Sequence, residues 1–162
     1  MKRTGVLLAV SSLPTPHGVG DLGQPAMDWI DILAENGVTI WQILPLNPTG
    51  YGNSPYQPYS SRAGDELYIS LETLAKEGLL TEEFPTEGNE SPRVEYEAVR
   101  AVKDAWLKKA YAAFTPDAEF EAFAGQEWVR DYCVFRAMKK ANGSRCWLEW
   151  PKEQRDWPET RG

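Results

Sequence analysis

The chain has 162 residues, enough for a domain with its own hydrophobic core, and a formal net charge of −7 at pH 7. This acidic balance argues against nucleic acid as a partner, because binding to phosphates requires clustered Lys and Arg. No run approaches the ~20 apolar residues of a membrane-spanning helix, so no membrane partner is expected.

The amino-terminal part predicts a strand, a helix and a second strand. Residues 5–10, GVLLAV, are a continuous apolar run typical of a strand buried on both faces. The charges before this run also suit a signal peptide, but Pro14 and Pro16 follow at once and no A-x-A cleavage site does, which favours the strand. A helix over 25–36 and a strand over 38–46 complete a βαβ unit with parallel strands.

A proline-rich, uncharged loop follows the second strand. Residues 47–61 read NPTGYGNSPYQPYSS and include Tyr51, Tyr56 and Tyr59. In parallel α/β folds ligands gather at the carboxyl ends of strands, where this loop begins. The prolines stiffen the loop, so its rings need little ordering on binding. An ordinary connector whose tyrosines cap the core explains the loop spacing equally well.

The rest of the chain is predicted to be mainly helical. A short apolar segment, residues 66–74, and a polar stretch, residues 81–94, precede two long helices. The first covers 95–114, and the second runs from Thr115 to about residue 140, with a break at Gly125. Their apolar stripes, which we expect to be core, are Val99, Val102, Trp106, Ala110 and Phe114, then Phe120, Phe123, Trp128, Tyr132, Phe135 and Met138.

Cysteine and histidine are too few for a metal site or a disulfide framework. Cys133 and Cys146 match no metal-binding spacing, and His17 is the single histidine. We therefore expect no metal, no cofactor and a reducing, cytoplasmic location.

Four segments of the sequence resemble one enzyme family. They are similar, in this order, to the amino-terminal part of the 4-alpha-glucanotransferases (amylomaltases or disproportionating enzymes) of glycoside hydrolase family 77. The segments are SSLPTPHGVGDLG, WQILPLNPTGYGNSPYQPYSS, LYISLETL and WVRDYCVFRAMKKANG…CWLEWP. The resemblance implies an α/β fold, the first strands of an incomplete (β/α)₈ TIM barrel at 1–72, followed by a helical insertion subdomain at 73–162. It also implies retaining transfer of alpha-1,4-glucan segments between maltooligosaccharides.

The resemblance carries four residues over as substrate-binding. Tyr56 matches a tyrosine that stacks beside the sugar at the bond being broken, and Ser54 and Gln57 match its polar neighbours in the groove. Tyr51 matches a tyrosine linked to glucan binding farther out. In some members a second tyrosine also contributes to this outer glucan site. The matching position in this sequence is Arg100, which argues against an outer glucan site in this chain.

Two further departures from the family pattern lie within the loop and just after it. Asn53 stands where Asp is usual, and GDEL at residues 64–67 stands where GNPL is usual. Neither departure changes the four residues carried over as substrate-binding.

No catalytic residue is expected in this chain. Retaining glycosyl transfer requires two carboxyl groups about 5–5.5 Å apart, and the family places them on later barrel strands. Asp21 has no evident partner on the second strand, and Asp65 and Glu66, being adjacent, should point to opposite sides of an extended segment.

The chain is therefore expected to be an amino-terminal fragment, inactive alone, whose partners are alpha-1,4-glucans and the missing carboxyl-terminal part of the enzyme. A non-catalytic alpha-glucan-binding module and a small domain whose aromatic loop binds protein are the alternatives.

Overall fold

The computed structural model describes residues 3–84 and 91–156. The chain divides into two compact units, Met1–Thr115 and Pro116–Gly162. The predicted boundary between 1–72 and 73–162 is a different division, between the start of a barrel and an insertion. It stays a prediction. Part of the polar stretch expected at 81–94 lies outside the described residues.

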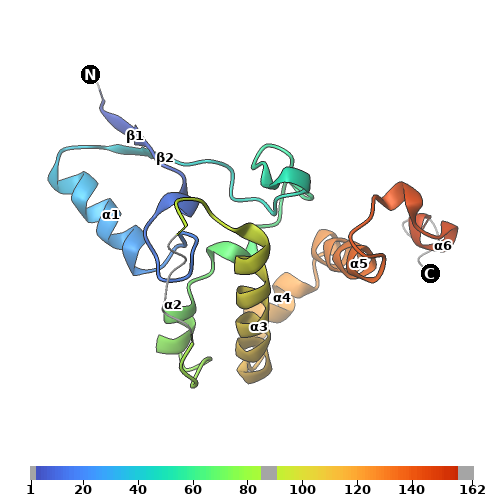
Figure 1. The fold of residues 1–162 in the computed structure, drawn as a ribbon. Helices are drawn as coiled ribbons and strands as arrows, with labels where there is room; N and C mark the ends of the chain where they lie inside the picture. The colour runs from blue at the N-terminus through green and yellow to red at the C-terminus, as the bar shows by residue number, and fades with distance from the viewer. Residues whose placement is uncertain (1–2, 85–90, 157–162) are drawn as a thin grey trace. The chain divides into compact units, whose positions relative to one another are not determined.

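A pair of short parallel strands opens the first unit (Figure 1). β1, Gly5–Leu7, pairs with β2, Ile40–Gln42, in the register Gly5 to Ile40 and Leu7 to Gln42. α1, Gln24–Glu35, connects them in sequence, with proline in its first turn and Gly37, at a φ of 69°, just after its end. The predicted βαβ order and parallel pairing are confirmed, although both strands are shorter than expected.

The two faces of the strand pair differ in their cover. Trp41 packs against the core cluster that includes Ala26 of α1. Because alternate residues of a strand point to opposite faces, Leu7 and Ile40 share the other face, and both are exposed. Ile43, just after β2, is also exposed, whereas Leu8, just after β1, is half-buried against the core.

Among the described residues of the first unit, three small clusters form the core. Their buried members are Val10, Leu13 and Ala26, then Val19, Leu67 and Val99, then Leu71, Leu80 and Ala110. Two 3₁₀ turns, η1 at Val10–Ser12 and η3 at Glu66–Tyr68, each supply a buried side chain to a cluster. The core therefore connects the loop after β1 with the helices that follow the tyrosine-rich segment.

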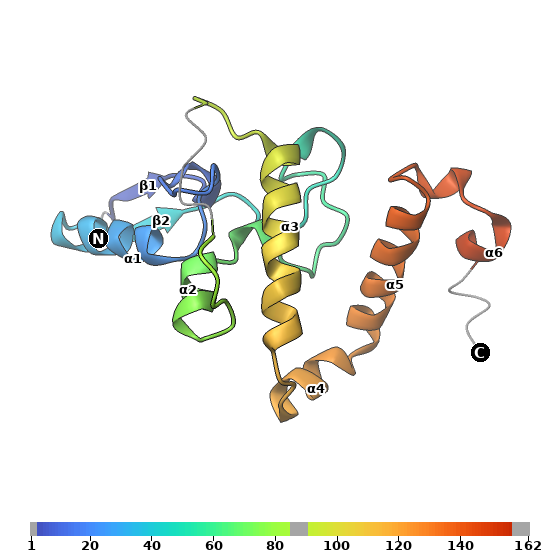
Figure 2. The ribbon, with the colours of Figure 1, turned by 60° about the horizontal axis from the view of Figure 1, so that its bottom comes forward.

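Two helices complete the first unit. α2, Leu71–Lys76, begins at Ser70, whose hydroxyl accepts a hydrogen bond from the amide of Thr73. α3, Tyr96–Ala113, packs against α2 and η3 (Figure 2). The predicted buried face of α3 is wrong at Val102, which is exposed. The neighbouring residue Lys103 is buried instead.

The second unit is helical. α4, Ala118–Ala124, and α5, Glu127–Ala141, are separated at Gly125, which confirms the predicted break. η4, Trp147–Glu149, and α6, Lys152–Arg155, follow.

The predicted burial of the aromatic stripe on these helices holds only in part, because most of its residues are half-buried rather than buried. Phe123 is exposed and α5 has no buried residue, since a helix buries a face only where a second layer covers it.

Among the described residues, no helix has the length and apolar character needed to cross a membrane. The same residues hold no group of three or more His, Cys, Asp or Glu side chains able to bind a metal ion. Cys133 and Cys146 are both free thiols on the surface.

Candidate functional site

The tyrosine loop, residues 47–61, closes on itself after leaving β2. Thr49 and Pro58 form an isolated antiparallel bridge. The amide of Gly50 donates to the carbonyl of Gln57 at 3.2 Å, and the amide of Tyr59 donates to the carbonyl of Pro48 at 2.9 Å. The loop is therefore a hydrogen-bonded structure rather than a loose connector.

Local turns shape the tip of the loop. η2, Tyr51–Asn53, contains Gly52 at a φ of 74°, a left-handed conformation that favours glycine. A side chain at Gly50 would place its Cβ 2.8 Å from the carbonyl oxygen of Gln57, so this close approach also requires glycine. The hydroxyl of Ser54 accepts a hydrogen bond from the amide of Tyr56 at 3.4 Å.

The four residues carried over as substrate-binding all lie on this tip. Tyr51 is 96% exposed and Tyr56 is 71% exposed, as expected for rings that do not belong to the core. Gln57 is exposed, while Ser54 is half-buried. The connector alternative, in which the tyrosines cap the core, does not fit Tyr51 and Tyr56, although Tyr59 at 39% exposed lies closer to it.

The base of the loop is fastened to α3. Arg100 donates to both carboxylate oxygens of Asp65, at 3.0 and 2.7 Å, and to the hydroxyl of Thr49 at 2.9 Å. Asp65 also accepts from the amides of Thr49 and Leu67, at 3.3 and 3.0 Å. Two departures from the family pattern, Asp65 and Arg100, are thus partners in this structure.

The expectation that Asp65 and Glu66 point to opposite sides is wrong. Both carboxylates lie within reach of Arg100, with the Glu66 oxygen 3.7 Å from its guanidinium. The reason is local: Asp65 is the N-cap of η3, so the segment turns at this point instead of continuing as a strand.

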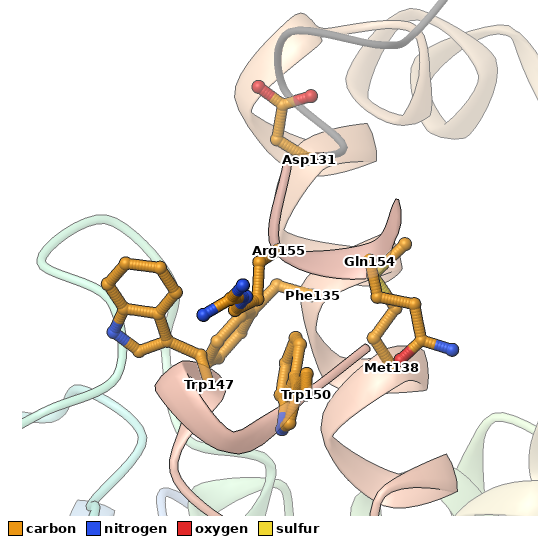
Figure 3. Close-up of a pocket in the computed structure, with 7 residues that line it drawn as sticks. All are labelled: Asp131, Phe135, Met138, Trp147, Trp150, Gln154 and Arg155. Carbon is orange, nitrogen blue, oxygen red and sulfur yellow. The ribbon is translucent and has the colours of Figure 1, made fainter. Parts of the chain in front are cut away.

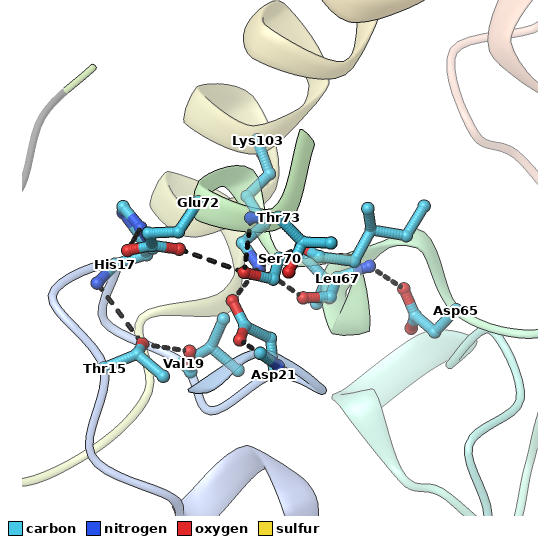
Figure 4. A network of polar contacts seen from close by, with 12 residues as sticks. Thr15, His17, Val19, Asp21, Asp65, Leu67, Ser70, Glu72, Thr73 and Lys103 are labelled. Atoms are coloured by element: carbon cyan, nitrogen blue, oxygen red, sulfur yellow. Dashed lines mark hydrogen bonds and ion pairs between the residues drawn. The ribbon is translucent and has the colours of Figure 1, made fainter. Parts of the chain in front are cut away.

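A buried ion pair, missed from the sequence, lies beneath the loop after β1 (Figure 4). Lys103 and Asp21 are each 1% exposed, and the Lys103 ammonium donates to an Asp21 oxygen at 3.0 Å. The same ammonium donates to the carbonyls of Leu67 and Ile69, at 2.6 and 2.8 Å, so its three protons have acceptors. The other Asp21 oxygen accepts from the amide of Gly23 at 3.0 Å.

A second polar network joins the first long loop to α2 (Figure 4). A ring nitrogen of His17 lies 2.7 Å from a carboxylate oxygen of Glu72, whose other oxygen accepts from the Ser70 hydroxyl at 3.1 Å. Burial raises the pKa of the Glu72 carboxyl, but its own backbone amide, His17 and Ser70 outweigh this and hold the pKa below the ordinary 4.5. The His17 ring also packs near Phe84, with centroids 5.6 Å apart.

An aromatic pocket of about 470 Å³ occurs within the second unit (Figure 3). It is lined by Asp131, Phe135, Met138, Trp147, Trp150, Gln154 and Arg155. The Phe135 and Trp150 rings pack at a centroid distance of 5.7 Å. None of the lining residues belongs to the tyrosine loop.

Comparison with known proteins places the chain in a family. The family model of the 4-alpha-glucanotransferases, glycoside hydrolase family 77, matches residues 8–161. The chain belongs to this family, which confirms the resemblance found in the sequence.

Similar proteins agree in name and in extent. The 4-alpha-glucanotransferase of Synechocystis is 42% identical over 93% of this chain and 32% of its own length, and that of Thermus thermophilus is 43% identical over 91% and 31%. The structure resembles that of an amylomaltase from Streptococcus agalactiae in complex with acarbose, with a TM-score of 0.81, 32% identity and coverage of 94% of this chain and 32% of that one. The chain therefore spans about a third of the length of these relatives.

Proposed function

We propose that the chain is the amino-terminal segment of a 4-alpha-glucanotransferase and supplies one wall of its alpha-1,4-glucan groove. The observation that carries the proposal is the tyrosine loop, a hydrogen-bonded loop that presents Tyr51 and Tyr56 to solvent in a chain of this family. Flat aromatic rings offer apolar faces to sugars, and a stiff loop loses little conformational entropy when it binds. The solved amylomaltase relative is a complex with acarbose.

Within this proposal, β1 and β2 are the first strands of a (β/α)₈ barrel, and the helical residues from about 73 onward belong to an insertion. The exposed face with Leu7 and Ile40 supports this view, because barrel strands pack side chains on both faces. The partner that covers this face is the remaining part of the same enzyme, which supplies the further strands.

The complete enzyme transfers alpha-1,4-glucan segments between maltooligosaccharides by a retaining mechanism, and this chain alone does not. The acids nearest the loop support the second statement. Asp21 is bound by Lys103 and Asp65 by Arg100, so each buried carboxylate already has a cationic partner and a structural role. In this proposal the chain contributes contacts to the sugar, and the later barrel strands of the enzyme contribute the two catalytic carboxyl groups.

The glucan contact is tested by titrating the chain with maltoheptaose and following the amide and ring signals of the loop by NMR. Tyr56→Ala should weaken binding several-fold, since a stacked ring contributes on the order of 1 kcal/mol. Tyr111→Ala is the matched control, because Tyr111 is 67% exposed on α3 and lies outside the loop. Equal effects of the two substitutions, or a large fall in melting temperature for Tyr56→Ala alone, would contradict the proposal.

A non-catalytic glucan-binding module predicts the same titration result, so a second experiment separates the two functions. The DNA downstream of codon 162 is sequenced and read in all frames. An in-frame or adjacent continuation that matches the other two thirds of the relatives supports the enzyme segment. A chain that binds maltoheptaose and has no such continuation is a binding module.

A further inference from the structure

One side chain of α3 connects the two ends of the tyrosine loop. The guanidinium of Arg100 donates to Thr49 at the start of the loop, at 2.9 Å, and to both oxygens of Asp65 just after its end. The Asp65 carboxylate also accepts a hydrogen bond from the amide of Thr49, at the start of the loop, at 3.3 Å. The three residues therefore form a closed set of contacts around the base of the loop.

The strength of this set comes from its charge and its burial. The Asp65 side chain is only 2% exposed and that of Arg100 is 25% exposed, so water competes little for the pair. A planar guanidinium that contacts both carboxylate oxygens is more directional and stronger than a neutral hydrogen bond. The base of the loop is consequently fixed in orientation as well as in position.

The tip of the loop lacks comparable support from packing. Tyr51 and Tyr56 are mostly exposed, so the hydrophobic core does not hold their rings in place. The backbone hydrogen bonds of Gly50 and Tyr59 lie between this tip and the base. The orientation of the rings therefore follows the orientation of the base.

We propose that Arg100 is a positioning residue for glucan binding, which tethers the tyrosine loop to α3 and sets the Tyr51 and Tyr56 rings for the sugar. The inference rests on the proposed function and assigns Arg100 a task different from an outer sugar contact. The guanidinium acts through Asp65 and Thr49, and its removal loosens the loop without removing a ring.

A single substitution does not test this cleanly, because Arg100→Met leaves the Asp65 carboxylate buried without its cation and destabilises the unit. The double variant Asp65→Asn/Arg100→Met removes the buried ion pair and the tether together, and the asparagine oxygen still accepts a hydrogen bond from the amide of Leu67. Glu66 also loses its contact with Arg100, but its side chain is 26% exposed and stays in contact with water. Lys108→Met is the matched control, since it removes a cation from the exposed surface of the same helix.

The first measurement is hydrogen exchange of the full chain by NMR, at the amides of Gly50 and Tyr59. In the double variant these amides should exchange about ten-fold faster or more, the loss expected for a charged hydrogen-bond set, while amides of α1 keep their wild-type rates. Lys108→Met should leave all of them unchanged. Wild-type protection of the loop amides in the double variant overturns the tether.

The second measurement is the affinity for maltoheptaose. The double variant should bind several-fold more weakly at a melting temperature close to that of the wild type, which a merely stabilising role of Arg100 does not predict. Unchanged affinity together with faster exchange overturns the positioning role. A wild-type chain that does not bind maltoheptaose overturns the glucan contact of the proposed function, and the positioning role with it. In that case the hydrogen-exchange measurement still decides whether Arg100 tethers the loop.

Arg100→Lys separates charge from geometry. Lysine keeps the positive charge beside Asp65 but lacks the planar fork that reaches Asp65 and Thr49 together. The free energy of unfolding of Arg100→Lys should be closer to that of the wild type than that of Arg100→Met is. The amides of Gly50 and Tyr59 should still exchange faster than in the wild type. Full restoration of loop protection by lysine overturns the claim that the guanidinium geometry is what holds the loop.

Discussion

Replacing Lys103 with methionine tests how strongly the buried ion pair holds the first unit together. The Lys103 side chain is 1% exposed, and its ammonium contacts one carboxylate oxygen and two carbonyl oxygens, which belong to Asp21, Leu67 and Ile69. Methionine keeps most of the volume of the side chain and removes only the charged end. The change in stability therefore reports the lost polar contacts rather than a new cavity.

The expected loss is large compared with the stability of the unit. Removing one partner of a buried pair costs about 3–5 kcal/mol, because the remaining charge stays in a poorly solvated site. The two carbonyl oxygens also lose a donor, which adds to the loss. Folded domains are stable by only about 0.05–0.15 kcal/mol per residue, so Lys103→Met should remove a substantial fraction of the free energy of unfolding.

Urea unfolding, followed through the NMR amide signals of α1 and α3, measures this loss in the first unit. Asp21→Asn/Lys103→Met should recover the larger part of it, because neither charge is then buried alone. Lys108→Met, on the exposed surface of α3, should lie within about 0.5 kcal/mol of the wild type. A loss as small as this for Lys103→Met would refute the reasoning.

Three further outcomes are expected. The purified chain should release no glucose from maltotriose, and turnover that follows the protein through repurification would contradict this. Because the pKa of Glu72 is lowered in the folded state, its contribution to stability is present above the ordinary value of 4.5 and is lost as the pH falls through the folded pKa. The stability difference between wild type and Glu72→Gln should therefore shrink on acidification, and a constant difference by thermal melts would argue against the His17 contact. The chain should self-associate in light scattering through Leu7 and Ile40, and Leu7→Lys/Ile40→Lys should reduce this; a monodisperse wild-type monomer would show that the face is not adhesive.

The local sequence determined the order of elements and the position of the tyrosine loop. Apolar runs, helix-stop glycines and prolines act over a few residues, so they predicted the βαβ order and the break at Gly125. They left open whether the tyrosines of the loop cap the core, and the structure decided this by exposing Tyr51 and Tyr56. The resemblance to the family predicts that these two rings bind the substrate, and this role stays a prediction. Strand length was overestimated, because a strand extends only as far as a partner supplies ladder hydrogen bonds, and the partner of β1 is three residues long.

Only the tertiary structure decided which charged groups meet. Lys103 and Asp21 are 82 residues apart in sequence, and Arg100 and Asp65 are 35 apart, so no local period indicates either pair. Lys103 lies on the buried face of α3, although the apolar pattern of the sequence predicts that Val102 is buried instead. Burial of an ammonium becomes favourable only when the fold brings a carboxylate and carbonyl oxygens to it, and that convergence is a property of packed elements rather than of any one segment.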